Sequence, residues 1–266
     1  MPEHVARTPL SEALALDEAG DHDGALAAYQ AILDQGDTGM HLNIGNTLQL
    51  LGRTEEAVTA FADGFAADDF DSGYNLASLL EELGRTAEAR RVYEKLVYQS
   101  YAPAKIALAW ILRAEGERAP AALLLQQTLT DTGTAGDLAA GILGHWMYEH
   151  GDRSDELLRH LHRGAANYPT ARVDLANLLY TKGDEKSAKA LLYSGEDADE
   201  AESLLPLANW VWSAGDLVEA ERLLLHAAAL GDRNSTENLS VLLKEQNRFA
   251  EARRWWLKAQ RMEPLL

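Results

Sequence analysis

A glycine returns at a nearly constant interval along the whole chain, and this period constrains the fold more than any local motif does. Eight equivalent positions, which we call the hinges, carry seven glycines and one asparagine: Gly20, Gly52, Gly84, Gly116, Gly151, Gly183, Gly215 and Asn247. Every step is 32 residues except the 35-residue step from Gly116 to Gly151. A fixed period of this length is typical of repeat solenoids, in which each repeat packs only on its neighbours.

The residues around each hinge predict a hairpin of two helices. Small or apolar residues stand eight, seven and four positions before the hinge and five and nine positions after it. Around Gly52 these residues are Ile44, Gly45, Leu48, Ala57 and Phe61. The spacing places them on one stripe of each helix. We expect the glycine to end the first helix with a positive φ, and an Asp, Thr or Ser after it to cap the second.

This pattern resembles the tetratricopeptide repeat over nearly the whole chain. The unit HLNIGNTLQLLGRTEEAVTAFADGF matches that family at the small residue, the hinge glycine, the alanine after the hinge and the aromatic residue. The closing stretch AAALGDRNSTENLSVLLKEQNRFAEARRWWLKAQ is more similar to the Sel1-like variant. We therefore expect an all-α, right-handed α-solenoid of about eight antiparallel hairpins, with residues 1–266 forming a single domain.

The charge of the chain narrows the range of partners. The formal net charge is −18 at pH 7, and residues 1–100 hold 18 acidic and 6 basic residues. Such a charge argues against nucleic-acid binding, which needs Lys and Arg to neutralise phosphates. Two interpretations of the acidic half remain open: it keeps the protein soluble, or it attracts a basic partner.

Composition also bears on compartment and cofactors. The chain has no cysteine, so disulfides and thiolate metal sites are excluded, and we expect no cofactor. Its first residues, MPEHVARTPLSEALAL, do not have the apolar core of a signal peptide. No apolar run reaches the length of a membrane span. We expect a cytoplasmic protein without a membrane partner, and the excess of arginine over lysine favours a bacterial, GC-rich source.

The resemblance implies a binding groove lined by the first helices of the hairpins. Residues nine, six and three positions before each hinge are expected to point into it. The candidate binding residues at the first two of these positions are Asn43, Asn46, Asn75, Trp110, His145, Asn177 and Asn209, and Ser78, Asp174 and Asn238 stand at the same offsets in other repeats. An asparagine side chain can pair with both the N–H and the C=O of an extended peptide. Alternatively, these asparagines bridge neighbouring helices, and both interpretations stay open.

A second series stands three positions before the hinges. It comprises Arg113, Tyr148, Tyr180, Trp212 and Lys244. Tyrosine and tryptophan are favoured at binding hot spots because they offer a large apolar area with a polar group. We expect an aromatic stripe along the groove, with packing on the adjacent helix as the alternative.

The fifth repeat gathers potential metal or catalytic ligands. His145, Glu149, His150, His160 and His162 fall within eighteen residues. His145 and Glu149, four apart on a helix, have the spacing of a metal site or a general base. However, Glu156 stands where the pattern requires alanine, which indicates an irregular repeat instead. No other catalytic motif is present, so we predict a protein that is not an enzyme.

Trp255 and Trp256 lie in the last hairpin, which no further repeat covers. Either they fold back onto the preceding helices, or they form a homodimer contact at the C-terminal end. The sequence therefore predicts a scaffold or adaptor that binds an extended peptide of a protein partner. The alternatives are a peptide-responsive regulatory protein, a self-assembling structural protein, and a hydrolase or metal enzyme centred on the fifth repeat.

Overall fold

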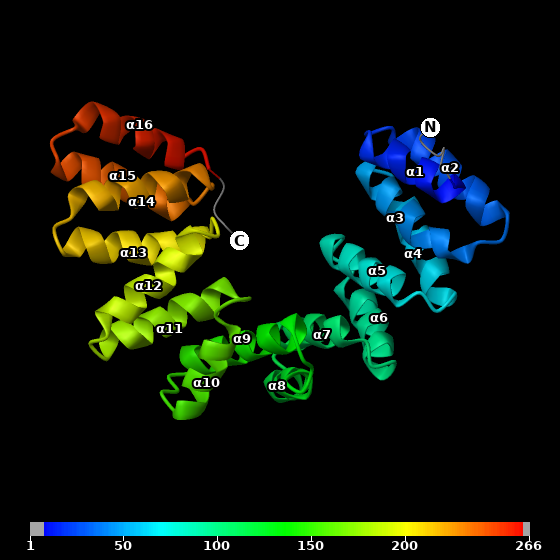
Figure 1. The fold of residues 1–266 in the computed structure, drawn as a ribbon, viewed down its shortest axis with the longest axis horizontal. Coiled ribbons are helices and arrows are strands. Elements are labelled where there is room, and N and C mark those ends of the chain that lie inside the picture. The colour runs from blue at the N-terminus through cyan, green and yellow to red at the C-terminus, as the bar shows by residue number, and fades with distance from the viewer. Residues whose placement is uncertain (1–7, 263–266) are drawn as a thin grey trace, which may run out of the picture. The chain divides into compact units, whose positions relative to one another are not determined.

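The computed structural model describes residues 8–262, which form helical hairpins and contain no strand (Figure 1). The chain forms two compact units, Met1–Leu124 and Leu125–Leu266. The helices of the first unit are α1 (Pro9–Glu18), α2 (His22–Asp34), α3 (His41–Leu50), α4 (Thr54–Ala66), α5 (Phe70–Glu82), α6 (Thr86–Tyr98), α7 (Ala102–Ala114) and the beginning of α8 (Arg118–Thr128). The boundary between the two units falls inside α8. A 3-10 turn, Thr38–Met40, precedes α3.

The second unit continues the alternation of first and second helices. Its helices are α9 (Thr134–Glu149), α10 (Asp155–Gly164), α11 (Pro169–Thr181), α12 (Glu185–Glu196), α13 (Ala201–Ser213), α14 (Leu217–Ala229), α15 (Arg233–Glu245) and α16 (Phe249–Ala259). The prediction of an all-α repeat fold is confirmed. Within residues 8–262, no helix is long and apolar enough to cross a membrane.

The predicted hinges end the first helix of every hairpin. All eight hinge residues adopt positive φ, from 62° at Asn247 to 88° at Gly215. Two backbone hydrogen bonds close each hinge. At Gly52, its own amide donates to the carbonyl of Gln49 over 2.9 Å, and the amide of Arg53 donates to the carbonyl of Leu48 over 2.8 Å. This is the Schellman motif, which satisfies carbonyls that the end of a helix leaves unpaired.

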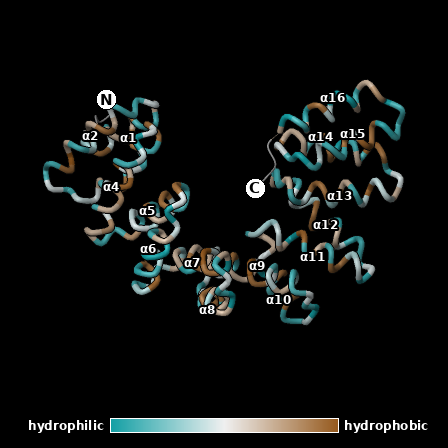
Figure 2. The backbone as a smooth tube through the Cα atoms, turned by 180° about the vertical axis from the view of Figure 1, so that it is seen from behind, coloured by the Kyte–Doolittle hydropathy of each residue, from teal (hydrophilic) through white to brown (hydrophobic). Residues whose placement is uncertain are grey.

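The predicted stripe forms the core of each hairpin. Ile44 and Leu48 are each 5% exposed, and Ala57 and Phe61 are fully buried. Gly45 lies directly against the Phe61 ring, so that a Cβ at this position would overlap the ring. The small residue therefore lets the two helices approach closely. Figure 2 shows that hydrophobic and hydrophilic residues alternate along the helices, as this one-sided burial requires.

The expected caps of the second helices are present in only some repeats. Asp184 and Asp216 accept a hydrogen bond from the amide three residues further on, as predicted. In α4 and α6, however, the expected threonines lie inside the helix, and the N-cap residue is an arginine without a side-chain cap. The Arg53 guanidinium instead pairs with Glu56 in the first turn, and Arg85 pairs with Glu88 in the same way. An ion pair thus forms where the side-chain cap was expected.

The fifth repeat is irregular for two physical reasons. The first helix, α9, begins 17 residues before its hinge, whereas α11 begins 14 before its own, so the three additional residues lengthen α9 by about one turn. The second helix starts later, at a Ser154 cap, and buries Leu157 and Leu161. Glu156, at the position of the usual alanine, is exposed. The core contact has therefore moved by one residue along α10.

The contact between Gly45 and Phe61 gives a test of the hairpin packing. We expect Gly45→Ala to lower stability, because overpacking costs about 1–3 kcal/mol and outweighs the roughly 1 kcal/mol that alanine gains in a helix. In a Phe61→Val background, which lacks the overlapping ring, the same substitution should become stabilising. Urea unfolding followed by circular dichroism measures both differences. Equal effects in the two backgrounds would show that the ring does not limit the approach.

Candidate functional site

The predicted groove residues all lie on first helices, in both units. We call the surface they form the first-helix face. The first unit contributes Asn43, Asn46, Asn75, Trp110 and Arg113, and the second contributes His145, Tyr148, Asn177, Tyr180, Asn209, Trp212 and Lys244. Asn46, Trp110, Asn209 and Lys244 are exposed, and the others are half-buried. The residues are therefore within reach of a partner on the face of each unit.

Side-chain bridges of one kind join neighbouring repeats on this face at three junctions of the described chain. Each runs from the residue six before one hinge to the residue nine before the next, 29 positions further on. The side-chain amide of Asn75 donates to Asn46 Oδ1 over 3.0 Å. The Asn238 amide donates to Asn209 Oδ1 over 3.2 Å. At the equivalent place, His145 Nδ1 and Asp174 Oδ2 lie 2.8 Å apart.

The asparagine bridges use only part of the hydrogen-bonding capacity of these side chains. A side-chain amide has two N–H donors and a carbonyl oxygen with two lone pairs. Asn46 uses its oxygen in the bridge, and Asn75 uses one N–H. The NH₂ group of Asn46 and the oxygen of Asn75 therefore keep capacity for a second partner. Bridging between helices and binding of a peptide backbone are compatible at these residues.

Asn177 differs from the other two asparagines at its position. The residue 29 positions further on is Pro206, inside α13, where Asn75 and Asn238 stand in other repeats. A proline ring has no group that can hydrogen bond to an amide. Asn177 is half-buried on α11, and its whole amide is left for other partners at this junction.

The aromatic series packs partly on the following repeat. The Tyr180 ring stacks on Trp210 with the centroids 4.3 Å apart and the planes 16° apart. The indole N–H of Trp212 donates to Glu245 over 3.0 Å. The Arg153 guanidinium lies 4.6 Å from the centroid of the Tyr148 ring. The three rings are half-buried, so each offers a partner one edge or face rather than its whole area.

The histidines of the fifth repeat have separate local surroundings. His145 lies against Asp174, whereas His150 Nδ1 lies 2.6 Å from the carbonyl oxygen of Trp146. His160 is close to Glu156, and burial lowers the pKa of His160. The described part of the chain contains no group of three or more His, Cys, Asp or Glu residues able to hold a metal ion.

The two tryptophans of the last hairpin have different environments. Trp255 packs against the hydrophobic core of the second unit, with the Lys258 ammonium 4.7 Å from its ring centroid. Trp256 is 51% exposed and lines a hollow of about 360 Å³ between α15 and α16, together with Val241 and Phe249. We call this hollow the C-terminal hollow. Residues 263–266, beyond the last helix, lie outside the described residues.

The sequence analysis did not consider the surface between consecutive second helices. Between α12 and α14, Arg222 pairs with Glu196 and with Glu219, and His226 Nε2 lies 2.9 Å from Asp199. Hydrogen bonds from Arg222 hold the pKa of Glu196 and of Glu219 below the ordinary range for glutamate. In the sequence, the charged residues at equivalent positions of consecutive second helices would have indicated this surface.

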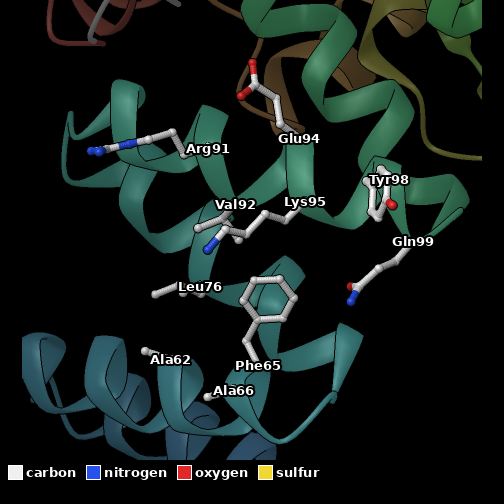
Figure 3. Close-up of a pocket in the computed structure, with 10 residues that line it drawn as sticks. All are labelled: Ala62, Phe65, Ala66, Leu76, Arg91, Val92, Glu94, Lys95, Tyr98 and Gln99. Carbon is white, nitrogen blue, oxygen red and sulfur yellow. The ribbon is translucent and has the colours of Figure 1, made fainter.

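The equivalent place between α4 and α6 is open. Ten residues line a cleft of about 790 Å³, which we call the α4–α6 cleft: Ala62, Phe65, Ala66, Leu76, Arg91, Val92, Glu94, Lys95, Tyr98 and Gln99 (Figure 3). Tyr98 at its rim is 91% exposed. The first unit therefore has a concave, largely apolar surface away from its first-helix face.

Comparisons with known proteins identify the repeats. The tetratricopeptide-repeat family model matches residues 71–100 and residues 234–260. The predicted resemblance to tetratricopeptide repeats is thus confirmed for these two stretches. The second match falls in the stretch expected to be Sel1-like, and the Sel1-like character is not shown. No curated protein sequence matches the chain significantly.

Solved structures agree on the fold at low sequence identity. A tetratricopeptide repeat protein from Parabacteroides merdae is 17% identical, with a TM-score of 0.58, and the alignment covers 89% of this chain and 96% of that one. A chain of the APC/C hetero-tetramer Cut9–Hcn1 is 13% identical, with a TM-score of 0.60, and the alignment covers 91% of this chain and 50% of that one. A chain of the human IFIT1 dimer with m7Gppp-AAAA is 15% identical, with a TM-score of 0.55, and the alignment covers 95% of this chain and 71% of that one.

The ion pairs between α12 and α14 predict a pH dependence of stability. Because Arg222 lowers the pKa of Glu196 and Glu219, their contribution is present above the unfolded value near 4.5 and is lost as pH falls through the lower folded values. Arg222→Gln should therefore flatten the fall in Tm between about pH 5 and pH 3. Arg91→Gln, at the equivalent position of α6, is the control and should leave the profile nearly unchanged. Identical profiles for wild type and Arg222→Gln would contradict the prediction.

Proposed function

We propose that this protein is a non-enzymatic scaffold that holds an extended peptide segment of a protein partner along the first-helix face of its second unit. Tetratricopeptide repeats support a protein-interaction role in general. The finer proposal rests on one observation, the presence of an amide side chain at the same position of two consecutive repeats of the second unit, in Asn177 and Asn209. An extended peptide presents its N–H and C=O groups at regular intervals, and a row of amides can pair with both.

The half-buried aromatic rings would supply apolar contact beside these amides. Tyr180 and Trp212 are already held by Trp210 and Glu245 of the next repeat. A ring whose rotamer is fixed in advance loses little entropy on binding, which favours affinity. The amides would hold the peptide backbone, and the rings would select side chains.

The charge favours a protein over a nucleic acid as the partner. With a net charge of −18, the chain would repel phosphates rather than release their counterions. The negative net charge favours a basic peptide segment at the first-helix face, and we place this function in the cytoplasm. A regulatory protein that responds to a peptide is the nearest alternative. An enzyme centred on the fifth repeat is a further alternative, in which His145 Nδ1 lies 2.8 Å from Asp174 Oδ2.

Asn177→Ala is the sharpest test of the amide row. Peptides selected from a random phage library against the wild-type protein should bind this variant about tenfold more weakly, because an unmade hydrogen bond to a buried group costs about 1–3 kcal/mol. The Tm should change little, since no side chain of the next repeat pairs with Asn177. Fluorescence anisotropy with the labelled peptides measures the affinity, and circular dichroism the Tm.

Two further variants make the test specific. Asn209→Ala should weaken binding and also lower stability by about 0.5–1.5 kcal/mol, because it removes the acceptor of the Asn238 bridge. Asn234→Ala, exposed at the start of α15, is the matched control and should change neither. If peptides selected on the wild type bind all three variants equally, the amide row does not hold the peptide.

The C-terminal hollow supports a second proposal, self-association into a dimer. Trp256 is 51% exposed, Val241 48% and Phe249 59%, whereas the residue equivalent to Trp256 is fully buried at Phe61. Large exposed apolar patches on soluble proteins usually mark contact sites. A second copy that packs the same end against it would cover these side chains by an isologous contact.

Light scattering at several protein concentrations tests this dimer. The wild type should have the mass of a dimer at high concentration, and Trp256→Ser should shift it to the monomer while keeping the Tm, because the indole is half exposed. Tyr98→Ser, which removes another exposed aromatic residue, should leave the mass unchanged. A wild type that stays monomeric throughout would rule out the contact.

A further inference from the structure

The α4–α6 cleft lies apart from the first-helix face, between the second helices of two consecutive repeats. Figure 3 shows Phe65 extending from α4 toward α6, and Val92 and Lys95 extending from α6 toward the same space. Leu76 of α5 is buried beneath them. The cleft thus combines an apolar floor with a cation and an exposed tyrosine, Tyr98, at its rim.

Another pair of repeats shows how this junction closes. Between α12 and α14, the residues seven and eleven positions after the hinge Gly215 are Arg222 and His226. Both reach Glu196, which stands thirteen positions after the preceding hinge: Arg222 Nη2 lies 3.0 Å from its carboxylate, and His226 Nδ1 lies 3.5 Å from it. One carboxylate on the earlier helix therefore contacts the side chains at both of these positions on the later one.

The α4–α6 cleft carries the same cationic positions without that carboxylate. Arg91 and Lys95 stand seven and eleven positions after Gly84, but Phe65 takes the place of Glu196. Arg91 Nε donates to the carbonyl of Ala87 on its own helix over 3.2 Å. Among the described residues, no carboxylate oxygen lies within 4.0 Å of a charged nitrogen of Arg91 or of Lys95.

We infer that the α4–α6 cleft binds an acidic peptide segment of another protein, in which a large apolar side chain is flanked by carboxylates. The apolar side chain would pack on Phe65, Val92 and Leu76. A flanking carboxylate would take the place that Glu196 has in the closed junction and would pair with Lys95 and Arg91. The exposed Tyr98 ring would cover the bound segment at one end.

The charges around the cleft are predominantly acidic. Glu94, which also lines the cleft, shares Arg90 with Glu115 and Glu117. Salt screens exposed charges that lie beyond about 8 Å at physiological ionic strength. Selection for carboxylates therefore depends on the two cations at the cleft itself. This site is independent of the proposed amide row, which lies on first helices.

The closed junction supplies the decisive variant, Phe65→Glu, which adds the carboxylate that Glu196 provides elsewhere. Random peptides displayed on phage are selected against the wild-type protein, and labelled copies are measured by fluorescence anisotropy at physiological salt. We expect one class of selected peptides to carry aspartate or glutamate beside a large apolar residue. Phe65→Glu, Lys95→Glu and Tyr98→Ser should each weaken that class at least about tenfold, which corresponds to 1.4 kcal/mol.

Two controls separate this site from the rest of the protein. Lys182→Glu makes the same charge change at an exposed position of the second unit and should leave the affinity unchanged. Asn177→Ala, which tests the amide row, should also leave this class unaffected. Phe65→Glu should retain its Tm, because the added carboxylate gains two cationic partners. The inference is overturned if no acidic class is selected, or if acidic peptides bind wild type, Phe65→Glu and Lys95→Glu equally.

Discussion

The backbone conformation of the hinge is the constraint on which the rest of the structure depends. An L-residue with a side chain pays about 1–2 kcal/mol to adopt positive φ, and the chain places glycine or asparagine at all eight hinges. The reversal they make sets the second helix antiparallel to the first at a fixed register. Only then can Gly45 meet Phe61 across the hairpin, and only then do the first helices of successive repeats lie side by side.

Most of the fold could be predicted because the same local pattern of residues recurs around each of the eight hinges. The hinge glycines and the stripe of Ile44, Leu48 and Phe61 are local patterns, and local patterns are readable in one sequence. The helix starts were less predictable, since Thr54 and Thr86 satisfy the same composition rule as a true cap. Whether a threonine caps or enters a helix depends on the preceding residue, and Arg53 pairs with Glu56 in three dimensions.

The positions of the candidate residues could be read from the sequence, but their contacts could not. Counting back from each hinge located Asn46, Asn177 and Asn209. It could not show that Asn46 meets Asn75, because that bridge depends on how far one repeat is offset from the next. The same limit hid the α4–α6 cleft, whose opening depends on a difference between Phe65 and Glu196 in repeats that are far apart in the chain. Comparison of equivalent positions across repeats exposes such differences only once the helix pairing is known.

Pro206 has a consequence for the motions of the second unit. It has no amide hydrogen to donate to the carbonyl of Glu202, one turn earlier in α13. The junction with α11 also lacks the amide bridge that Asn209 and Asn238 form at the next one, although Arg172 pairs with Glu200 at the start of α13. Helices bend most readily where a proline removes a backbone hydrogen bond. The first turn of α13 should therefore be where this helix bends most readily when the second unit adjusts to a ligand.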